Sequence, residues 1–196
     1  MPLKSIQSAL SAFSIDMDKR ILFFCLAGFL FVSLFGALSH FFYGWSGQNK
    51  VAGIFFAANE STWEHLKLAL FPTLLYFLAW AFFMDRANYL FAFFIALVTP
   101  VLLIPLLFYG YTAIAGNSVL AADIAIYFFS VAAAFFFTGL VLRAPPLPRA
   151  CSVLALLGIA VLLVCYATFT LFPPQNFLFR DPLTGGYGLP KDPPNR

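Results

Sequence analysis

Long apolar runs restrict this chain to a membrane-embedded fold. Several stretches exceed the roughly 18 consecutive apolar residues that indicate a membrane-spanning helix. Hydrophobic residues make up 62% of the sequence and charged residues 10%, whereas soluble domains carry roughly a quarter charged residues. The runs are much longer than the roughly ten-residue strands of a membrane barrel and lack their alternating polarity. We therefore predict an all-α, polytopic integral membrane protein.

The predicted spans divide the chain into three parts. Residues 21–172 are expected to fold as a transmembrane bundle of about five helices. Residues 1–20 precede it as a cytoplasmic segment whose apolar residues recur at helical spacing, which is typical of a helix lying on a membrane surface. Residues 173–196 follow as an extracytoplasmic tail, whose prolines and glycines exclude regular structure. The predicted helices cover residues 21–43, 62–84, 88–109, 119–142 and 150–172.

Basic residues near the ends of the spans predict the orientation, because Lys and Arg are retained on the cytoplasmic side. We therefore expect a bacterial inner-membrane protein with a cytoplasmic N-terminus and an extracytoplasmic C-terminus. The net charge of +3 reflects this topology, and no basic patch indicates a nucleic-acid partner. Lys50 and Lys67 fall on the extracytoplasmic side with the tail residues Arg180, Lys191 and Arg196, whereas the cytoplasmic side has Lys4, Lys19, Arg20, Arg86, Arg143 and Arg149.

A polar block at residues 59–67 (NESTWEHLK) interrupts the apolar sequence and contains two of the eight acids and one of the two histidines. Ser61 and Glu64 match the S/T-x-x-E capping box, so a purely structural role explains them as well as chemistry does. Capping does not explain Glu60 or His65. The apolar segment 51–58 before the block is too short to span, and it is expected either to re-enter the outer leaflet or to lie flat at the interface.

Imidazole and carboxylate groups from three parts of the chain are predicted to share the extracytoplasmic face. A carboxylate inside a spanning helix, such as Asp123, is costly and indicates function. Two histidines with several carboxylates are typical of sites that bind zinc, manganese or ferrous iron. We predict that His40, His65 and Asp123 ligate such a metal, although the spacing is not HExxH. Glu60 or Glu64 would then take a proton from metal-bound water.

The block 59–67 resembles the signature Asn-Glu-Ser-x-Trp-Glu-His-x-Lys of a bacterial family of small polytopic membrane proteins of unknown function. This resemblance implies a membrane fold and no activity. More loosely, the chain is similar to the ceramidase-like membrane hydrolases, in which inward His, Asp and Ser residues bind zinc. That likeness implies metal-dependent hydrolysis, although this chain has fewer histidines.

Three classes of function fit these observations. The first is a metal-dependent hydrolase of a lipid or interfacial small-molecule substrate. The second is a non-catalytic membrane subunit or assembly factor, whose polar block contacts a partner subunit or another copy of the chain. The third is a small proton-coupled carrier, in which Asp123 and the histidines titrate. In each case the tail is expected to pack over the polar block as a lid.

Overall fold

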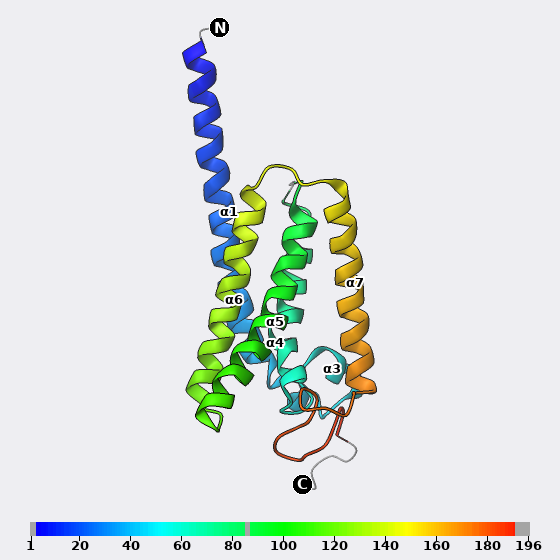
Figure 1. The fold of residues 1–196 in the computed structure, drawn as a ribbon. Coiled ribbons are helices and arrows are strands. Elements are labelled where there is room, and N and C mark those ends of the chain that lie inside the picture. The colour runs from blue at the N-terminus through cyan, green and yellow to red at the C-terminus, as the bar shows by residue number, and fades with distance from the viewer. Residues whose placement is uncertain (1–2, 85–86, 191–196) are drawn as a thin grey trace.

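The computed structural model is a bundle of α-helices (Figure 1). It describes residues 3–84 and 87–190, with side chains from residue 18 onward. Within these ranges there are seven helices and no strand, which confirms the predicted all-α class. The helices are α1 (Leu3–Ser39), α2 (Phe42–Trp45), α3 (Lys50–Phe55), α4 (Thr62–Trp80), α5 (Tyr89–Ala115), α6 (Leu120–Arg143) and α7 (Arg149–Leu171).

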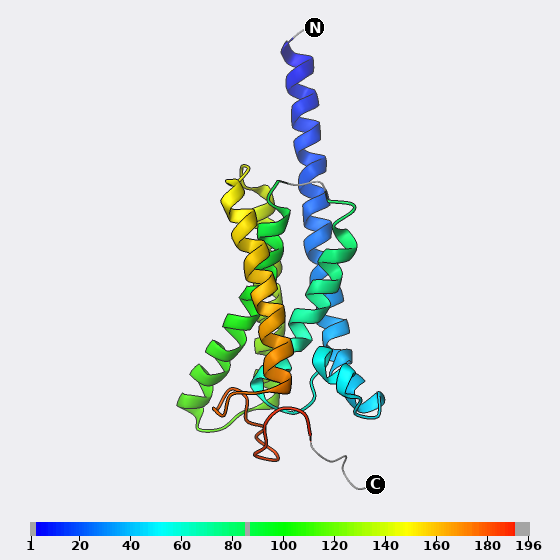
Figure 2. The ribbon, with the colours of Figure 1, turned by 90° about the vertical axis from the view of Figure 1, so that its right-hand side faces the viewer.

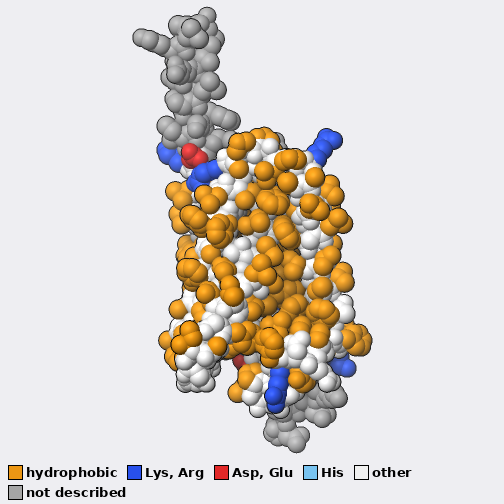
Figure 3. All heavy atoms as spheres, viewed as in Figure 1, with side chains coloured by type: hydrophobic (Ala, Val, Ile, Leu, Met, Phe, Trp, Pro, Cys, Tyr) orange, Lys and Arg blue, Asp and Glu red, His pale blue; other side chains and the backbone are white. Residues whose placement is uncertain are grey.

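Among the described residues, four helices are long and apolar enough to cross a membrane: the Asp18–Ser39 part of α1, and α5, α6 and α7. Helix α4, the other predicted span, has 19 residues and runs alongside them in the bundle (Figures 1 and 2). It differs in composition because its first two turns carry Glu64, His65 and Lys67. Hydrophobic side chains cover most of the face shown in Figure 3. The protein is therefore an integral membrane protein.

Helix α1 is continuous and projects beyond the rest of the bundle (Figures 1 and 2). The segment 1–20 was expected to be a separate surface helix. No proline or glycine lies between residues 3 and 20, so the helix continues from this segment into the first span. The amphipathic side chains before residue 18 and that of Lys4 are outside the described part, as are Arg86, Lys191 and Arg196.

Close helix packing fixes the end of α1 that leads to His40. At Gly36, a Cβ atom would overlap the Tyr127 hydroxyl and the Leu68 carbonyl oxygen. The Tyr127 hydroxyl donates a hydrogen bond to the Val32 carbonyl at 2.8 Å. Small residues permit this approach of helices in a membrane. Helices α1, α4 and α6 are thereby held together one turn before the candidate site.

Short helices and the tail cover the end of the bundle where α1 and α7 finish (Figures 1 and 2). Helix α3 occupies most of the segment expected to be re-entrant or interfacial, and it lies at this end of the bundle. The chain then returns through residues 56–61 to α4. The tail packs against this return and the start of α4: the side-chain amide of Asn59 donates to the Gly188 carbonyl at 2.8 Å, and the Trp63 backbone amide donates to the Leu178 carbonyl at 3.0 Å.

Candidate functional site

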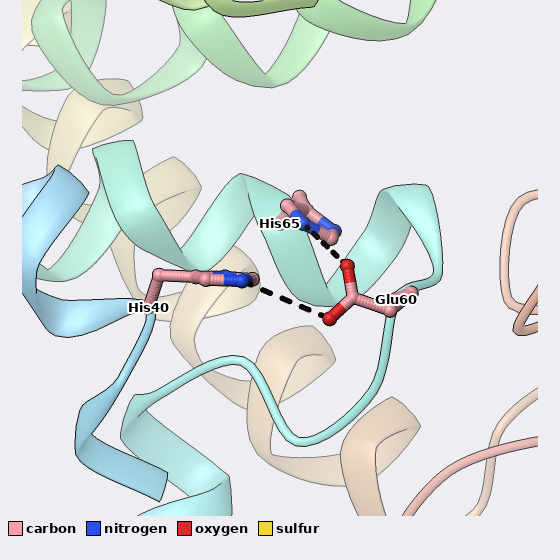
Figure 4. A group of neighbouring side chains, drawn as sticks. All are labelled: His40, Glu60 and His65. Atoms are coloured by element: carbon pink, nitrogen blue, oxygen red, sulfur yellow. Dashed lines mark ion pairs between the residues drawn. The ribbon is translucent and has the colours of Figure 1, made fainter. Parts of the chain in front are cut away.

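Two histidines and one glutamate from three segments meet at the end of the bundle that bears the tail (Figure 4). His40 directly follows α1, Glu60 precedes α4, and His65 lies near the start of α4. The distance from Glu60 Oε1 to His40 Nε2 is 3.7 Å, and that from Glu60 Oε2 to His65 Nε2 is 3.3 Å. One donor atom from each residue lies within 4.8 Å of the others. Glu60 therefore bridges the two imidazoles.

The local turn before α4 sets the direction of Glu60. Ser61 is the N-cap, and its hydroxyl accepts a hydrogen bond from the Glu64 amide at 3.3 Å. The side-chain oxygen of Asn59 accepts from the Ser61 amide at 2.8 Å. These two bonds fix a compact turn at which Glu60 stays outside the helix. The Glu60 carboxylate therefore lies next to His65, which is one helical turn after Ser61.

The hydrogen bonding of His65 requires a cation between His65 and Glu60. His65 Nδ1 lies 3.0 Å from the Ser61 carbonyl oxygen, which can only accept, so Nδ1 carries a proton. In the neutral ring, Nε2 would then be a lone-pair acceptor 3.3 Å from a carboxylate oxygen. Two acceptors at this distance need a proton or a metal ion between them. The Nδ1 contact is also the backbone bond that commonly orients a metal-ligating histidine.

The electrostatics of the site favour, at Glu60 and His40, the protonation states that metals require. The hydrogen bond from His65 lowers the pKa of Glu60 below its ordinary value, despite partial burial. Burial lowers the pKa of His40, and the neighbouring His65 lowers it further. At neutral pH Glu60 is therefore an anion and His40 is neutral. Metal ligands must be deprotonated in this way.

The spacing of the three residues suits a tetrahedral metal with open positions. Ligand bonds of about 2.1 Å separate neighbouring donors by roughly 3.4 Å in a tetrahedron. This is close to the 3.3 Å between Glu60 Oε2 and His65 Nε2, and His40 Nε2 lies 3.7 Å from the other carboxylate oxygen, Oε1. The His40, His65 and Glu60 side chains are 31%, 34% and 42% exposed, so solvent reaches the group. Two histidines and one carboxylate with free positions are typical of catalytic zinc and non-haem iron sites.

Asp123 does not join this group, although it was predicted as a ligand. It lies in the first turn of α6, where its carboxylate accepts a hydrogen bond from the Tyr111 hydroxyl. The same hydroxyl accepts from the Val119 amide at 2.9 Å. Asp123 therefore closes the turn between α5 and α6, and this turn leans away from α2 and α3 (Figure 2). Sharing one face of the membrane does not bring residues into contact.

Glu64, predicted as an alternative base, points into the bundle and is 2% exposed. Its Oε2 accepts from Lys67 Nζ at 2.6 Å and from the Ala58 amide at 2.9 Å, and its Oε1 accepts from the Thr170 hydroxyl at 3.3 Å. Lys67 also donates to the Gly53 carbonyl at 2.7 Å. The pair joins α3, α4, α7 and the return loop. A Glu and a Lys three residues apart on a helix are placed to pair, but nothing in the sequence indicates the contacts with Thr170 and Gly53.

Comparison with known proteins gives a family and no activity. A family model described as a family of unknown function (DUF6512) matches residues 15–189, a range that includes the whole candidate site. No curated protein and no solved structure matches the chain. The looser likeness to ceramidase-like hydrolases stays a hypothesis.

Proposed function

We propose a function for this chain, which belongs to the DUF6512 family of unknown function: it binds zinc, manganese or ferrous iron and hydrolyses a lipid or interfacial substrate. His40, Glu60 and His65 are the proposed ligands. The observation that supports the proposal is the facing pair of acceptors, His65 Nε2 and Glu60 Oε2, 3.3 Å apart. A divalent ion would be held by these two groups, with the neutral His40 as the third ligand.

The chemistry follows from the donor set. A divalent metal lowers the pKa of bound water towards neutrality and polarises a substrate carbonyl or phosphoryl oxygen. Ser61 holds His65 in the tautomer that presents Nε2. Of the two glutamates proposed as the base, Glu60 alone faces the histidines, so its carboxylate would also be the group that accepts a proton from metal-bound water. We assign Glu64 a structural role, because Lys67 occupies its carboxylate.

Exposed aromatic residues beside His40 favour a substrate at the membrane interface. Phe41 and Trp45 are 54% and 68% exposed, and their rings stack with centroids 5.9 Å apart. The Phe41 ring lies 5.4 Å from the His40 ring. Tryptophan side chains such as Trp45 concentrate at the level of the lipid headgroups. An amphiphile could place its polar head at the metal and its apolar part along these rings.

We also propose that the site faces the extracytoplasmic side of a bacterial inner membrane. The described ends of the chain lie at opposite ends of the bundle (Figure 1), and the site is at the C-terminal end. The bundle end from which α1 projects carries the basic residues Lys19, Arg20, Arg143 and Arg149, and Figure 3 shows blue side chains gathered there. Such residues are retained in the cytoplasm.

A non-catalytic subunit or assembly factor is the second candidate. Phe177 and Leu183 of the tail are 70% and 80% exposed at the same end of the bundle as the site. Exposed apolar side chains at this position suit a contact with a partner subunit or a second copy of the chain.

Metal analysis of the detergent-purified protein tests the proposal. We expect near-stoichiometric zinc, manganese or iron in the wild type and in Asp123→Asn, which lies outside the group. We expect loss of the metal in His40→Ala and in His65→Ala, with circular dichroism showing that both remain helical. The metal-bound wild type should hydrolyse an ester or phosphoester lipid in mixed micelles, and His65→Ala should not. Folded wild type that stays metal-free after incubation with all three ions would rule the proposal out.

A further inference from the structure

A groove on the membrane-facing side of the bundle lies far from the metal ligands. It runs between α1 and α6 and has a volume of about 320 Å³. Apart from Arg143, its walls are uncharged and almost entirely apolar. The lining residues are Leu22, Cys25, Leu26, Phe29, Ala132, Phe135, Phe136, Gly139, Leu140 and Arg143.

Along α6 the groove is about as long as one leaflet is thick, and along α1 it is shorter. On α6 its lining extends from Ala132 to Arg143, which is about 16 Å at 1.5 Å per residue. Half of the hydrocarbon core of a bilayer is about 15 Å thick. On α1 the lining extends from Leu22 to Phe29, and this helix runs in the opposite direction. The groove therefore runs from the basic end of the bundle towards the middle of the membrane.

Gly139 keeps the groove open beneath Arg143. A Cβ atom at Gly139 would lie 3.0 Å from Arg143 Nη1 and 3.3 Å from Cys25 Sγ. Without it, the guanidinium folds back and donates from Nη1 to the Gly139 carbonyl at 3.2 Å. A larger residue would both displace this arginine and fill the space between the helices.

The charges at the mouth of the groove suit a phosphate. Arg143 Nε donates to Asp18 at 3.2 Å, and the two side chains are 40% and 60% exposed. Arginine has five N–H donors in a fixed fork, so it can bind this carboxylate and a phosphate together. Lys19 and Arg20 follow Asp18 and are also exposed. Arg143 and Lys19 are therefore two exposed cations beside the one described carboxylate at this end of the groove.

We propose that this groove is a binding site for one phospholipid molecule, with an acyl chain between α1 and α6 and the phosphate at Arg143. The site belongs to the leaflet at the N-terminal end of the bundle. It is independent of the metal ligands, so its presence or absence does not bear on the proposed hydrolase activity.

Photo-crosslinking in vesicles tests the site. The probe is phosphatidylglycerol carrying a diazirine either near the glycerol or near the end of one acyl chain, in phosphatidylcholine vesicles. Mass spectrometry of the labelled peptides should place the first label near Leu22 and Leu140, and the second near Phe29 and Ala132. Labelling on the exposed face of α7, at Leu154, Leu157 and Val161, measures general contact with the bilayer.

Matched variants distinguish lipid binding in the groove from general contact with the bilayer. Gly139→Leu should abolish the groove cross-links and leave those on α7 unchanged, whereas Gly110→Leu, where a Cβ meets nothing within 4 Å, should change neither. Arg143→Gln should weaken labelling at limiting probe by roughly tenfold or more, and the exposed Arg149→Gln should not. Equal labelling of groove and α7, or groove labelling that survives Gly139→Leu in folded protein, would overturn the proposal, as would a dimer that buries α1 and α6 against a second copy.

Discussion

The ammonium nitrogen of Lys67 lies 2.6 Å from Oε2 of Glu64, and the two side chains are 0% and 2% exposed. Charges are seldom buried this completely, because leaving water costs several kcal/mol for each ion. Here the remaining hydrogen bonds come from Gly53, Ala58 and Thr170. The pair therefore connects α4 to α3, to the loop that carries Glu60, and to α7.

Removal of one member of this pair should destabilise the protein strongly. Glu64→Gln leaves the Lys67 ammonium buried without its counter-charge, and we expect a loss of about 3–5 kcal/mol in the free energy of unfolding. The double variant Glu64→Leu/Lys67→Met should recover most of that loss, because it removes both charges. Unfolding in detergent with increasing denaturant measures the effect. Glu60→Gln serves as the control, because Glu60 is half-exposed. If Glu64→Gln and Glu60→Gln lost the same free energy of unfolding, Glu64 would have no special structural role.

The fold could be predicted because a membrane-spanning helix is recognised by the length of its apolar run alone. The runs that became α1, α5, α6 and α7 are visible without any knowledge of their neighbours. It was harder to predict that residues 3–20 and the first span form one continuous helix, because continuity depends on the absence of a helix breaker and not on polarity. The 51–58 segment was left open between two arrangements, because six helical residues can be oriented only by what they pack against.

The candidate site could be predicted only in part. Glu60 and His65 stood out as polar residues that capping did not explain, His40 was expected at the same face of the membrane, and the structure brings the three together. Asp123 was grouped with them because it shares their side of the membrane, but its partner is Tyr111, twelve residues before it. Which of several polar residues at one face meet depends on helix rotation and tilt. A single sequence specifies these only through packing.

Metal binding should release about one proton per ion at neutral pH, because the proton between His65 and Glu60 must leave before a metal occupies its place. The pKa of His40 is lowered from the ordinary 6.5, mainly by burial, so this residue adds no proton at pH 7. Calorimetry in buffers of different ionisation enthalpy measures the number. Affinity should decrease as the pH falls, and more steeply once His40 also becomes protonated below 6.5. A proton count near zero at pH 7 would argue against the protonated pair in the metal-free state.

The tail should contribute to stability through one buried aromatic residue. Phe179 is 5% exposed and packs on Trp63 and Phe169, with ring centroids 4.8 and 5.6 Å away. Phe179→Ala should cost about 3–5 kcal/mol and increase amide exchange at Trp63, which donates to the Leu178 carbonyl. Phe177→Ala is the comparison, because Phe177 is 70% exposed and should cost much less. Equal, small losses in the two variants would mean that the tail is only loosely associated.

Gly36 should couple the packing of α1 to the metal site. An alanine Cβ at this position overlaps the Tyr127 hydroxyl and the Leu68 carbonyl oxygen, so α1 must move away from α4 and α6. His40 lies one helical turn further on, and a displacement of about 1 Å there would upset donor spacings that metals tolerate only within about 0.2 Å. We therefore expect Gly36→Ala to lower stability by about 1–3 kcal/mol and to weaken metal binding.

Gly110→Ala provides the matched control for this coupling, because a Cβ at Gly110 meets nothing within 4 Å. Alanine favours helix over glycine by roughly 1 kcal/mol, so Gly110→Ala should leave stability unchanged or increase it, with full metal content. Thermal unfolding and metal analysis of both variants measure the two effects. If Gly36→Ala lost stability but bound metal as tightly as Gly110→Ala, the position of His40 would be set by α2 and the loop before α4, and not by the packing of α1.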